Sequence, residues 1–236
     1  MKKLILYLIF LSAVFFGSAV IVSGSSQNAL DAISEKNKKA FSSTVVLDAG
    51  HGGEDGGAVA ADGTVEKDIN LNISNDIAAY FELFGIDYVP VRTTDVSVCD
   101  DGLGTIGERK KSDIFNRFEL VNSFENSILL SIHQNFFEES KYSGTQVFYS
   151  DNNESSKILA GDIRKAVVEA LAPDNTREIK ASDSSIYLLY KAQTTSVLVE
   201  CGFISNEDEL EKLKSPIYDS QISYFIFKGL LNYLNR

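Results

Sequence analysis

Four side chains of this sequence, all of types that bind metal ions, are spaced so that they could meet in one site. His51 and His133, the two histidines of the chain, each follow a short apolar run of the kind that forms a buried strand. Glu200 closes a third such run, and Glu66 lies in the first turn of a predicted helix, where the helix dipole favours a carboxylate. Ligands collect beyond the carboxyl ends of strands in an open α/β sheet, so we expect these side chains to converge there.

Two imidazoles and one carboxylate would hold Zn²⁺ and leave one coordination position for water, as in hydrolytic zinc sites. The remaining carboxylate could then act as general base toward that water and pass the proton to a departing amine. Each residue alone also fits an ordinary structural role, such as a hydrogen-bonded scaffold histidine or an acid in the first turn of a helix. Because the four residues form no compact motif such as HExxH, their spacing leaves a metal site and these structural roles both open.

The elements that must position these residues follow from the apolar pattern. Short apolar runs alternate with segments of helical spacing, which predicts a three-layer α/β/α fold with a mostly parallel central sheet of about six strands. The predicted strands are residues 45–48, 86–91, 128–132, 145–150, 185–189 and 197–200. The predicted helices are residues 66–84, ending at Gly85, then 109–124, 155–171, a short helix opened by Ser205 and Asp208, and 217–234.

The N-terminus is predicted to direct export. Lys2 and Lys3 precede an apolar run over residues 4–22, which is about long enough to cross a hydrocarbon layer. The positive-inside rule places the lysines in the cytoplasm and the rest of the chain outside it. We therefore predict an extracytoplasmic protein that contacts the membrane through its N-terminal segment. The alternative is a secreted protein whose signal peptide is cut near Ser25.

The remaining sequence is sufficient for one folded domain. We predict a signal anchor or signal peptide over residues 1–24, a polar linker over 25–43 and a single catalytic domain over 44–236. The apolar fraction of 44% and the charged fraction of 23% are ordinary for a globular protein. A formal net charge of −11 argues against a nucleic-acid partner, because phosphate binding needs a basic surface.

Cys99 and Cys201, the two cysteines, are too few for a disulfide scaffold, although a single bridge is left open. Cys201 follows Glu200 directly. We interpret it as a small buried residue at a strand end rather than as a nucleophile.

Several blocks of the sequence share the form and order of blocks in one known family. They are residues 46–58 (VLDAGHGGEDGGA), 66–71 (EKDINL), 91–95 (VRTTD), Arg117 with Asn122, 131–135 (SIHQN), 143–149 (SGTQVFY) and 197–206 (VLVECGFISN). They resemble the zinc-dependent N-acetylmuramoyl-L-alanine amidases, and the resemblance covers residues 45 to 235. Such a run of blocks in family order is more specific than any single block.

The resemblance implies roles for the four residues. His51, Glu66 and His133 would be the Zn²⁺ ligands and Glu200 the catalytic carboxylate. The reaction would be hydrolysis of the peptidoglycan amide bond between the lactyl group of N-acetylmuramic acid and L-alanine, by zinc-activated water. The short layout, without a separate wall-binding module, resembles the sporulation amidases that trim the spore cortex.

Two other functions remain open at this stage. The same ligand set could serve a zinc peptidase or carboxypeptidase that acts on wall peptides, or the domain could be an inactive wall-binding regulator. An activating protein partner is also left open.

The chain departs from the family pattern at Tyr190 and Thr195, where relatives often have a basic residue and a proline, so substrate contacts at these positions are in question. For Arg92 and Arg117 we predict structural roles.

Overall fold

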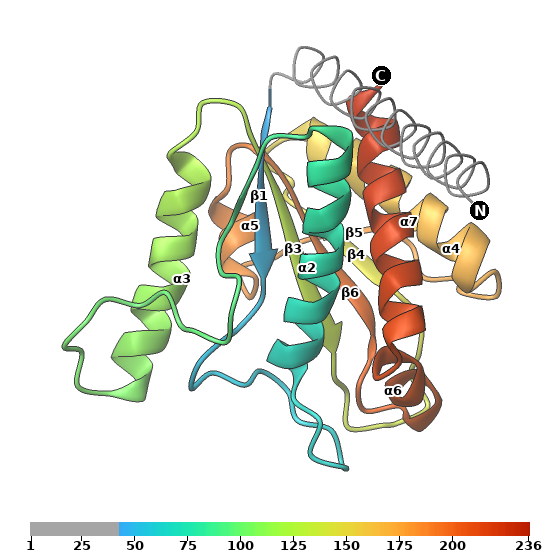
Figure 1. Cartoon of the computed structure of the whole chain (residues 1–236), viewed down its shortest axis with the longest axis horizontal. Coiled ribbons are helices and arrows are strands. Elements are labelled where there is room, and N and C mark those ends of the chain that lie inside the picture. Colours follow the sequence, from blue (N-terminus) through green and yellow to red (C-terminus); the bar gives the residue numbers. More distant parts are fainter. Residues whose placement is uncertain (1–42) are drawn as a thin grey trace, which may run out of the picture.

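The computed structural model describes residues 43–236, whose strands form one six-stranded sheet in the order β2-β1-β3-β6-β4-β5 (Figure 1). The strands are β1 (Thr44–Ala49), β2 (Tyr88–Pro90), β3 (Ser127–Asn135), β4 (Gln146–Tyr149), β5 (Lys180–Ala181) and β6 (Thr195–Phe203). All neighbouring pairs are parallel except β4 and β6, which are antiparallel. The prediction of a mostly parallel sheet of about six strands is confirmed.

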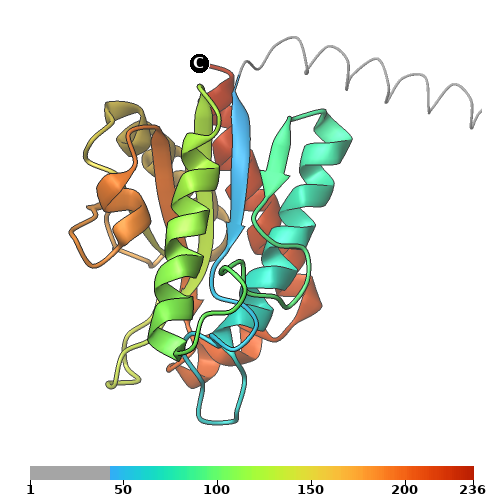
Figure 2. The ribbon, with the colours of Figure 1, turned by 90° about the vertical axis from the view of Figure 1, so that its left-hand side faces the viewer.

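Helices cover both faces of this sheet, as the three-layer prediction required. They are α2 (Glu66–Phe84), α3 (Ile106–Asn122), α4 (Glu154–Leu171), α5 (Tyr187–Lys191), α6 (Glu207–Leu213) and α7 (Pro216–Leu234). Helices α3 and α5 lie on one side of the sheet and α2 and α7 on the other (Figure 2). Helix α4 packs against α7 on that second side, and α6 lies beyond the carboxyl end of β6 (Figure 1).

Helix α2 begins and ends where the sequence predicted. Ile69, Ile73, Ile77 and Phe81 form a stripe at i, i+4 spacing, and each is at most 4% exposed. This spacing places the stripe on one face of the helix, against the sheet and α7. Gly85 ends the helix in the left-handed conformation, with φ of 66°, which a glycine adopts at little cost. The burial of this stripe fixes the start of α2, and therefore Glu66, relative to the strands.

Two local predictions were wrong. Residues 185–189 were expected to form a strand, but they run into helix α5, and the strand before β6 is instead β5, Lys180–Ala181. The side chain of Asp183 accepts hydrogen bonds from the backbone N–H and the hydroxyl of Ser185, which starts a turn rather than an extended segment. Short apolar runs do not by themselves distinguish a strand from a buried helical turn.

The second error concerns the start of α6. Asn206, not Ser205, caps this helix, because its side chain accepts from the backbone N–H of Glu209. The Ser205 hydroxyl accepts instead from the backbone N–H of Phe137, in the loop after β3. The predicted capping box is therefore replaced by a single asparagine cap.

The predicted export segment, residues 1–24, and nearly all of the predicted linker lie outside the described residues. Over residues 43–236, no helix combines the length and apolar character that a membrane span requires. Both cysteines are free, so the bridge left open by the sequence is not formed. Cys201 is 1% exposed in β6, as expected for a packing residue, and burial raises the pKa of its thiol.

Candidate metal centre

Three adjacent parallel strands and one helix bring the four predicted residues together. His51 lies just beyond the end of β1, and His133 lies near the end of β3. Glu200 is the β6 partner of His133 in the register between the two strands. Glu66 is the first residue of α2. The predicted convergence beyond the carboxyl ends of the strands is what the structure shows.

The Glu66 carboxylate lies between the two imidazoles. Its Oε1 is 2.9 Å from His133 Nδ1, and its Oε2 is 3.3 Å from His51 Nε2. One ligand atom from each of the three residues lies within 4.8 Å of the others, and Glu66 is only 3% exposed. The same carboxylate accepts from the backbone N–H groups of Ala58 and Gln134, at 2.9 and 3.0 Å. These bonds hold a buried carboxylate in one orientation, as a metal ligand requires.

Two glycines allow the backbone to approach this cluster. A Cβ atom at Gly57 would lie 2.5 Å from Glu66 Oε2, and one at Gly50 would lie 2.2 Å from His133 Nε2. Gly57 also has a φ of 70°, a conformation that glycine adopts readily. The glycine-rich block around His51 is therefore needed for close packing around this cluster, and is not simply a flexible loop.

Arg117, from α3, holds the backbone that carries His51. Its Nη2 donates to the carbonyl of His51 at 2.7 Å, and its Nη1 donates to the carbonyl of Ala49 at 3.0 Å. Its charge is matched by the carboxylates of Asp48 and Asp113. Among the described residues other than glycine, His51 is the one with a positive φ, 62°. Arg117 therefore stabilises a backbone conformation that is otherwise unfavourable.

Arg92 holds the same segment from the other side. Its Nε donates to the carbonyl of Ala49 at 2.9 Å, and its Nη2 donates to the carbonyls of Gly50 and Lys67 at 3.0 and 2.8 Å. The last bond joins the His51 loop to the first turn of α2. Both arginines are buried, Arg92 against backbone carbonyls and Arg117 against backbone carbonyls and carboxylates, in agreement with the structural roles predicted for them.

Asp55 is a candidate functional side chain that the spacing argument missed. Its Oδ2 is 2.9 Å from Nδ1 of His51, and its Oδ1 is 2.7 Å from the ammonium of Lys110. Burial raises the pKa of Asp55, but the hydrogen bonds from Lys110 and His51 lower it to about 2. A carboxylate on Nδ1 fixes the ring so that Nε2 faces Glu66. The available signal was a carboxylate four residues after a candidate ligand, in a glycine-rich loop.

Glu200 differs from Glu66 in its surroundings. Within residues 43–236, its Oε2 is buried and has no hydrogen-bond partner. Burial and the negative charge of Glu66 raise the pKa of Glu200 to about 7, although the nearby His133 and His51 oppose the shift. A carboxyl group with this pKa can both take up and release a proton near neutral pH.

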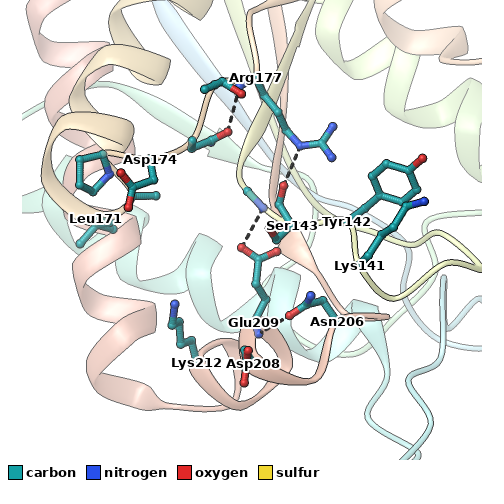
Figure 3. Close-up of a pocket in the computed structure, with 15 residues that line it drawn as sticks. Lys141, Tyr142, Ser143, Leu171, Asp174, Arg177, Asn206, Asp208, Glu209 and Lys212 are labelled. Carbon is teal, nitrogen blue, oxygen red and sulfur yellow. Dashed lines mark hydrogen bonds between the residues drawn. The ribbon is translucent and has the colours of Figure 1, made fainter.

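A hollow of about 660 Å³ lies beside the end of β6 (Figure 3). Glu209, on α6, accepts from the backbone N–H groups of Gly144 and Phe203, at 2.9 and 2.8 Å. Arg177 donates to the carbonyl of Ser143 at 2.7 Å. The Glu209 bonds attach the segment before β4 to the end of the Glu200 strand, and the Arg177 bond attaches it to the segment before β5. None of the four predicted site residues lines this hollow.

The two departures from the family pattern, Tyr190 and Thr195, are not among the residues of the metal-binding cluster. Thr195 is buried at the amino end of β6, five residues before Glu200, which corresponds to roughly 16 Å of extended strand. Tyr190 is 48% exposed on α5, on the α3 side of the sheet.

Comparisons with known proteins agree with this geometry. The model of the N-acetylmuramoyl-L-alanine amidase family matches residues 45–232. The germination-specific N-acetylmuramoyl-L-alanine amidase of Bacillus subtilis is 31% identical over 196 residues, which cover 81% of this chain and 80% of that protein.

Solved structures are similar over the same region. The CwlD amidase from Clostridioides difficile, in complex with the GerS lipoprotein, is 38% identical with a TM-score of 0.78, covering 81% of this chain and 98% of that one. The amidase AmiC2 of Nostoc punctiforme is 28% identical with a TM-score of 0.68, covering 82% and 97%. The first two relatives agree with the predicted likeness to short sporulation amidases. From the family match over nearly the whole described region, together with this fold, the chain belongs to the N-acetylmuramoyl-L-alanine amidase family of enzymes.

Proposed function

We propose that this chain hydrolyses the peptidoglycan amide bond between the lactyl group of N-acetylmuramic acid and L-alanine. In this proposal, His51, Glu66 and His133 hold Zn²⁺ and Glu200 is the catalytic carboxylate. The observation that supports it best is the buried Glu66 carboxylate between two imidazoles, with three ligand atoms within 4.8 Å. The unpartnered Oε2 of Glu200 beside this cluster supports the catalytic role.

The residues fit a zinc ion. Two nitrogens and one carboxylate oxygen are a donor set of hydrolytic zinc sites, and the Nδ1 of His51 is already occupied by Asp55. When bound, Zn²⁺ would polarise the scissile carbonyl and lower the pKa of the attacking water.

Glu200 moves the protons. Its carboxylate accepts a proton from the attacking water and then delivers it to the nitrogen of L-alanine as the C–N bond breaks. The raised pKa of Glu200 suits both halves of this cycle. Arg117 and Asp55 take no proton in this scheme, because they hold the backbone and the ring of His51.

Glu200→Gln tests the division of roles. The variant should keep about one zinc per chain by elemental analysis and lose catalysis by roughly 10² to 10⁴, the range expected for a general acid-base. His133→Ala should lose zinc as well as activity. Loss of zinc in the Glu200 variant would make Glu200 a ligand. Retention of both zinc and turnover would remove Glu200 from the mechanism.

Product analysis separates this function from the peptidase alternative. Mass spectrometry of purified peptidoglycan after digestion should show peptides with a free N-terminal L-alanine and sugars with a free lactyl carboxylate. Cleavage within the stem peptide instead would support the peptidase. Binding without cleavage would support the inactive regulator.

We also propose that the domain acts outside the cytoplasmic membrane, attached through residues 4–22 or released by cleavage near Ser25. The apolar run after two lysines supports export. The complex of the similar C. difficile amidase with a lipoprotein supports an extracytoplasmic protein partner. Protease added to spheroplasts should digest the domain, and resistance would contradict export. Crosslinking in intact cells should capture the partner.

A further inference from the structure

Asn70 lies within α2, one turn after Glu66, and its side chain is completely buried. Asparagine is a poorer helix former than an apolar residue of similar size such as leucine, and a buried carboxamide is costly unless its polar atoms find partners. The neighbours of Asn70 on the buried side of the helix, Ile69 and Ile73, are apolar. Apolar packing alone therefore does not explain an asparagine at this position.

The hydrogen-bond partners of Asn70 come from three separate segments. Its Nδ2 donates to the carbonyl of Gly50 at 3.2 Å and to Oε1 of Glu66 at 3.3 Å. Its Oδ1 accepts from Nε2 of Gln134 at 3.1 Å. One carboxamide thus joins the loop after β1, the start of α2 and the end of β3, which meet at the carboxyl ends of the strands (Figure 1).

These three segments are the ones that carry the proposed metal ligands. Gly50 immediately precedes His51. Gln134 immediately follows His133. Glu66 is itself a proposed ligand, and its Oε1 also accepts from the backbone N–H of Gln134 at 3.0 Å. The carboxamide in α2 therefore contacts one proposed ligand directly and the chain neighbours of the other two.

The chemistry of the partners determines which way both carboxamides face. A backbone carbonyl and a carboxylate only accept hydrogen bonds, so the NH₂ group of Asn70 must face Gly50 and Glu66. Its oxygen must then accept, so the NH₂ group of Gln134 faces Asn70. This leaves Oε1 of Gln134, which is 3% exposed, without a hydrogen-bond partner within residues 43–236. A buried carbonyl without a donor is unfavourable, so stability alone does not explain this pair of residues.

We propose that Asn70 is a positioning residue for the metal centre, which sets the spacing of His51, Glu66 and His133 by joining their three segments. The inference rests on the proposed function, because the ligands are the ones proposed there. Gln134 acts one contact further out, by holding the carboxamide of Asn70. Partners of this kind orient metal ligands without binding the metal themselves.

Zinc affinity of the purified full-length chain, measured by competition with a chelator, tests this role without turnover. Asn70→Leu keeps the approximate size of the side chain and removes its three hydrogen bonds. We expect zinc binding to weaken by roughly 10- to 100-fold, the range typical for outer partners of metal ligands. The comparison is made where urea denaturation shows the variant to be folded. Unchanged zinc affinity in Asn70→Leu would overturn the proposal.

Cobalt substitution separates positioning from a loss of stability. Co²⁺ bound in place of Zn²⁺ has a visible absorption spectrum that reports the number and arrangement of its ligands, so we expect this spectrum to change in folded Asn70→Leu. Ser74→Ala is the matched control. Ser74 lies one further turn along the same face of α2, is 4% exposed, and its hydroxyl has no hydrogen-bond partner within residues 43–236. A control that changes zinc affinity and spectrum as much as Asn70→Leu would overturn the positioning role.

Gln134→Met keeps the proposal testable if Asn70→Leu does not fold. It leaves Asn70 in place but removes the donor that holds its oxygen, so zinc binding should weaken by a smaller factor than in Asn70→Leu. Full zinc affinity in Gln134→Met would remove Gln134 from the network. In that case, an unchanged cobalt spectrum in Asn70→Ala would overturn the role of Asn70 as well.

Activity on whole peptidoglycan separates this inference from the proposed function. Release of peptides with N-terminal L-alanine by a zinc-containing wild type supports the proposed function whatever the variants show. Weaker zinc binding in Asn70→Leu, in a chain whose wild type releases no such product, would support the positioning role and overturn the proposed reaction.

Discussion

The two faces of the sheet are stabilised by different means. On the side of α2, α4 and α7, a large continuous cluster of buried apolar side chains fills the space and includes Phe81, Ile163 and Phe227. On the side of α3 and α5, the buried apolar cluster is small and includes Val46, Val121, Leu129, Leu189 and Leu198. On this second side, the region next to the His51 loop holds buried charged side chains instead of apolar ones.

That buried charge centres on Asp48 and Arg117. The guanidinium is 4% exposed and the carboxylate 1% exposed. Ser131 Oγ also donates to Asp48, at 2.6 Å. Burial raises the pKa of Asp48, but Arg117 and the hydrogen bonds lower it, so the carboxyl group stays ionised. One face therefore mainly stabilises the fold, while the other accepts the cost of buried charge because the charge positions the His51 loop.

Arg117→Met should have the largest effect, because it acts on both stability and the metal site. The buried Asp48 carboxylate loses its partner, so the free energy of unfolding should fall by about 3–5 kcal/mol. The His51 carbonyl also loses its donor, so zinc affinity should fall. Urea denaturation and chelator competition measure the two effects. The double variant Arg117→Met with Asp48→Asn should recover part of the stability. No recovery would show that the unpaired Asp48 charge does not cause the loss of stability.

Phe227→Ala should match that loss of stability without the loss of zinc affinity. Phe227 is 1% exposed and packs against Tyr80 and Phe84, with ring centroids 5.2 and 4.9 Å away. Removing a buried aromatic ring costs about 3–5 kcal/mol. The same two measurements apply, at a temperature where the variant is folded. A drop in zinc affinity as large as that of Arg117→Met would erase the distinction between the two faces.

Asp55→Asn should show the opposite pattern, with zinc binding affected far more than stability. Loss of the carboxylate on His51 Nδ1 should weaken zinc affinity by roughly 10- to 100-fold. The unfolding free energy should change by less than about 1 kcal/mol, because Asp55 is partly exposed. Lys110→Ala is the control, because it removes the ion pair with Asp55 and leaves the contact between Asp55 and His51 in place. This variant should have a smaller effect on zinc affinity. Unchanged affinity in Asp55→Asn would remove Asp55 from the metal centre.

Asp219→Asn should give the smallest effect and should stabilise the protein. Asp219 is 6% exposed on α7, and its Oδ1 has no hydrogen-bond partner within residues 43–236. Burial, with the charge of Asp76, raises its pKa to about 6. The folded state therefore binds this proton more tightly than the unfolded state does. The resulting stability is complete below the ordinary pKa near 4 and is lost as the pH rises through about 6.

Removing the ionisable group should consequently raise the free energy of unfolding by about 1–2 kcal/mol at pH 8. The gain should vanish at pH 4, where wild type is protonated. Urea denaturation at both pH values measures it. A gain that is equal at the two values would point to packing instead of ionisation.

Much of the scaffold could be predicted because its signals are local. The α2 stripe of Ile69, Ile73 and Ile77 has helical spacing, and the apolar runs of β1, β3 and β6 have the length of buried strands. The failures occurred where apolar runs were short, as at residues 185–189, and where two polar residues competed to cap a helix, as at Ser205 and Asn206. In both places a few hydrogen bonds decide between conformations of similar energy.

By itself, the sequence determined which residue types stand at the strand ends and at the start of α2, and therefore that His51, Glu66, His133 and Glu200 could meet. Only the tertiary structure decided what surrounds them. Arg117 reaches the His51 carbonyl across 66 residues of sequence, and Lys110, on the same helix, reaches Asp55 in the same loop. Such contacts depend on how α3 packs on the sheet, and no periodicity within a single segment encodes the orientation of one segment against another.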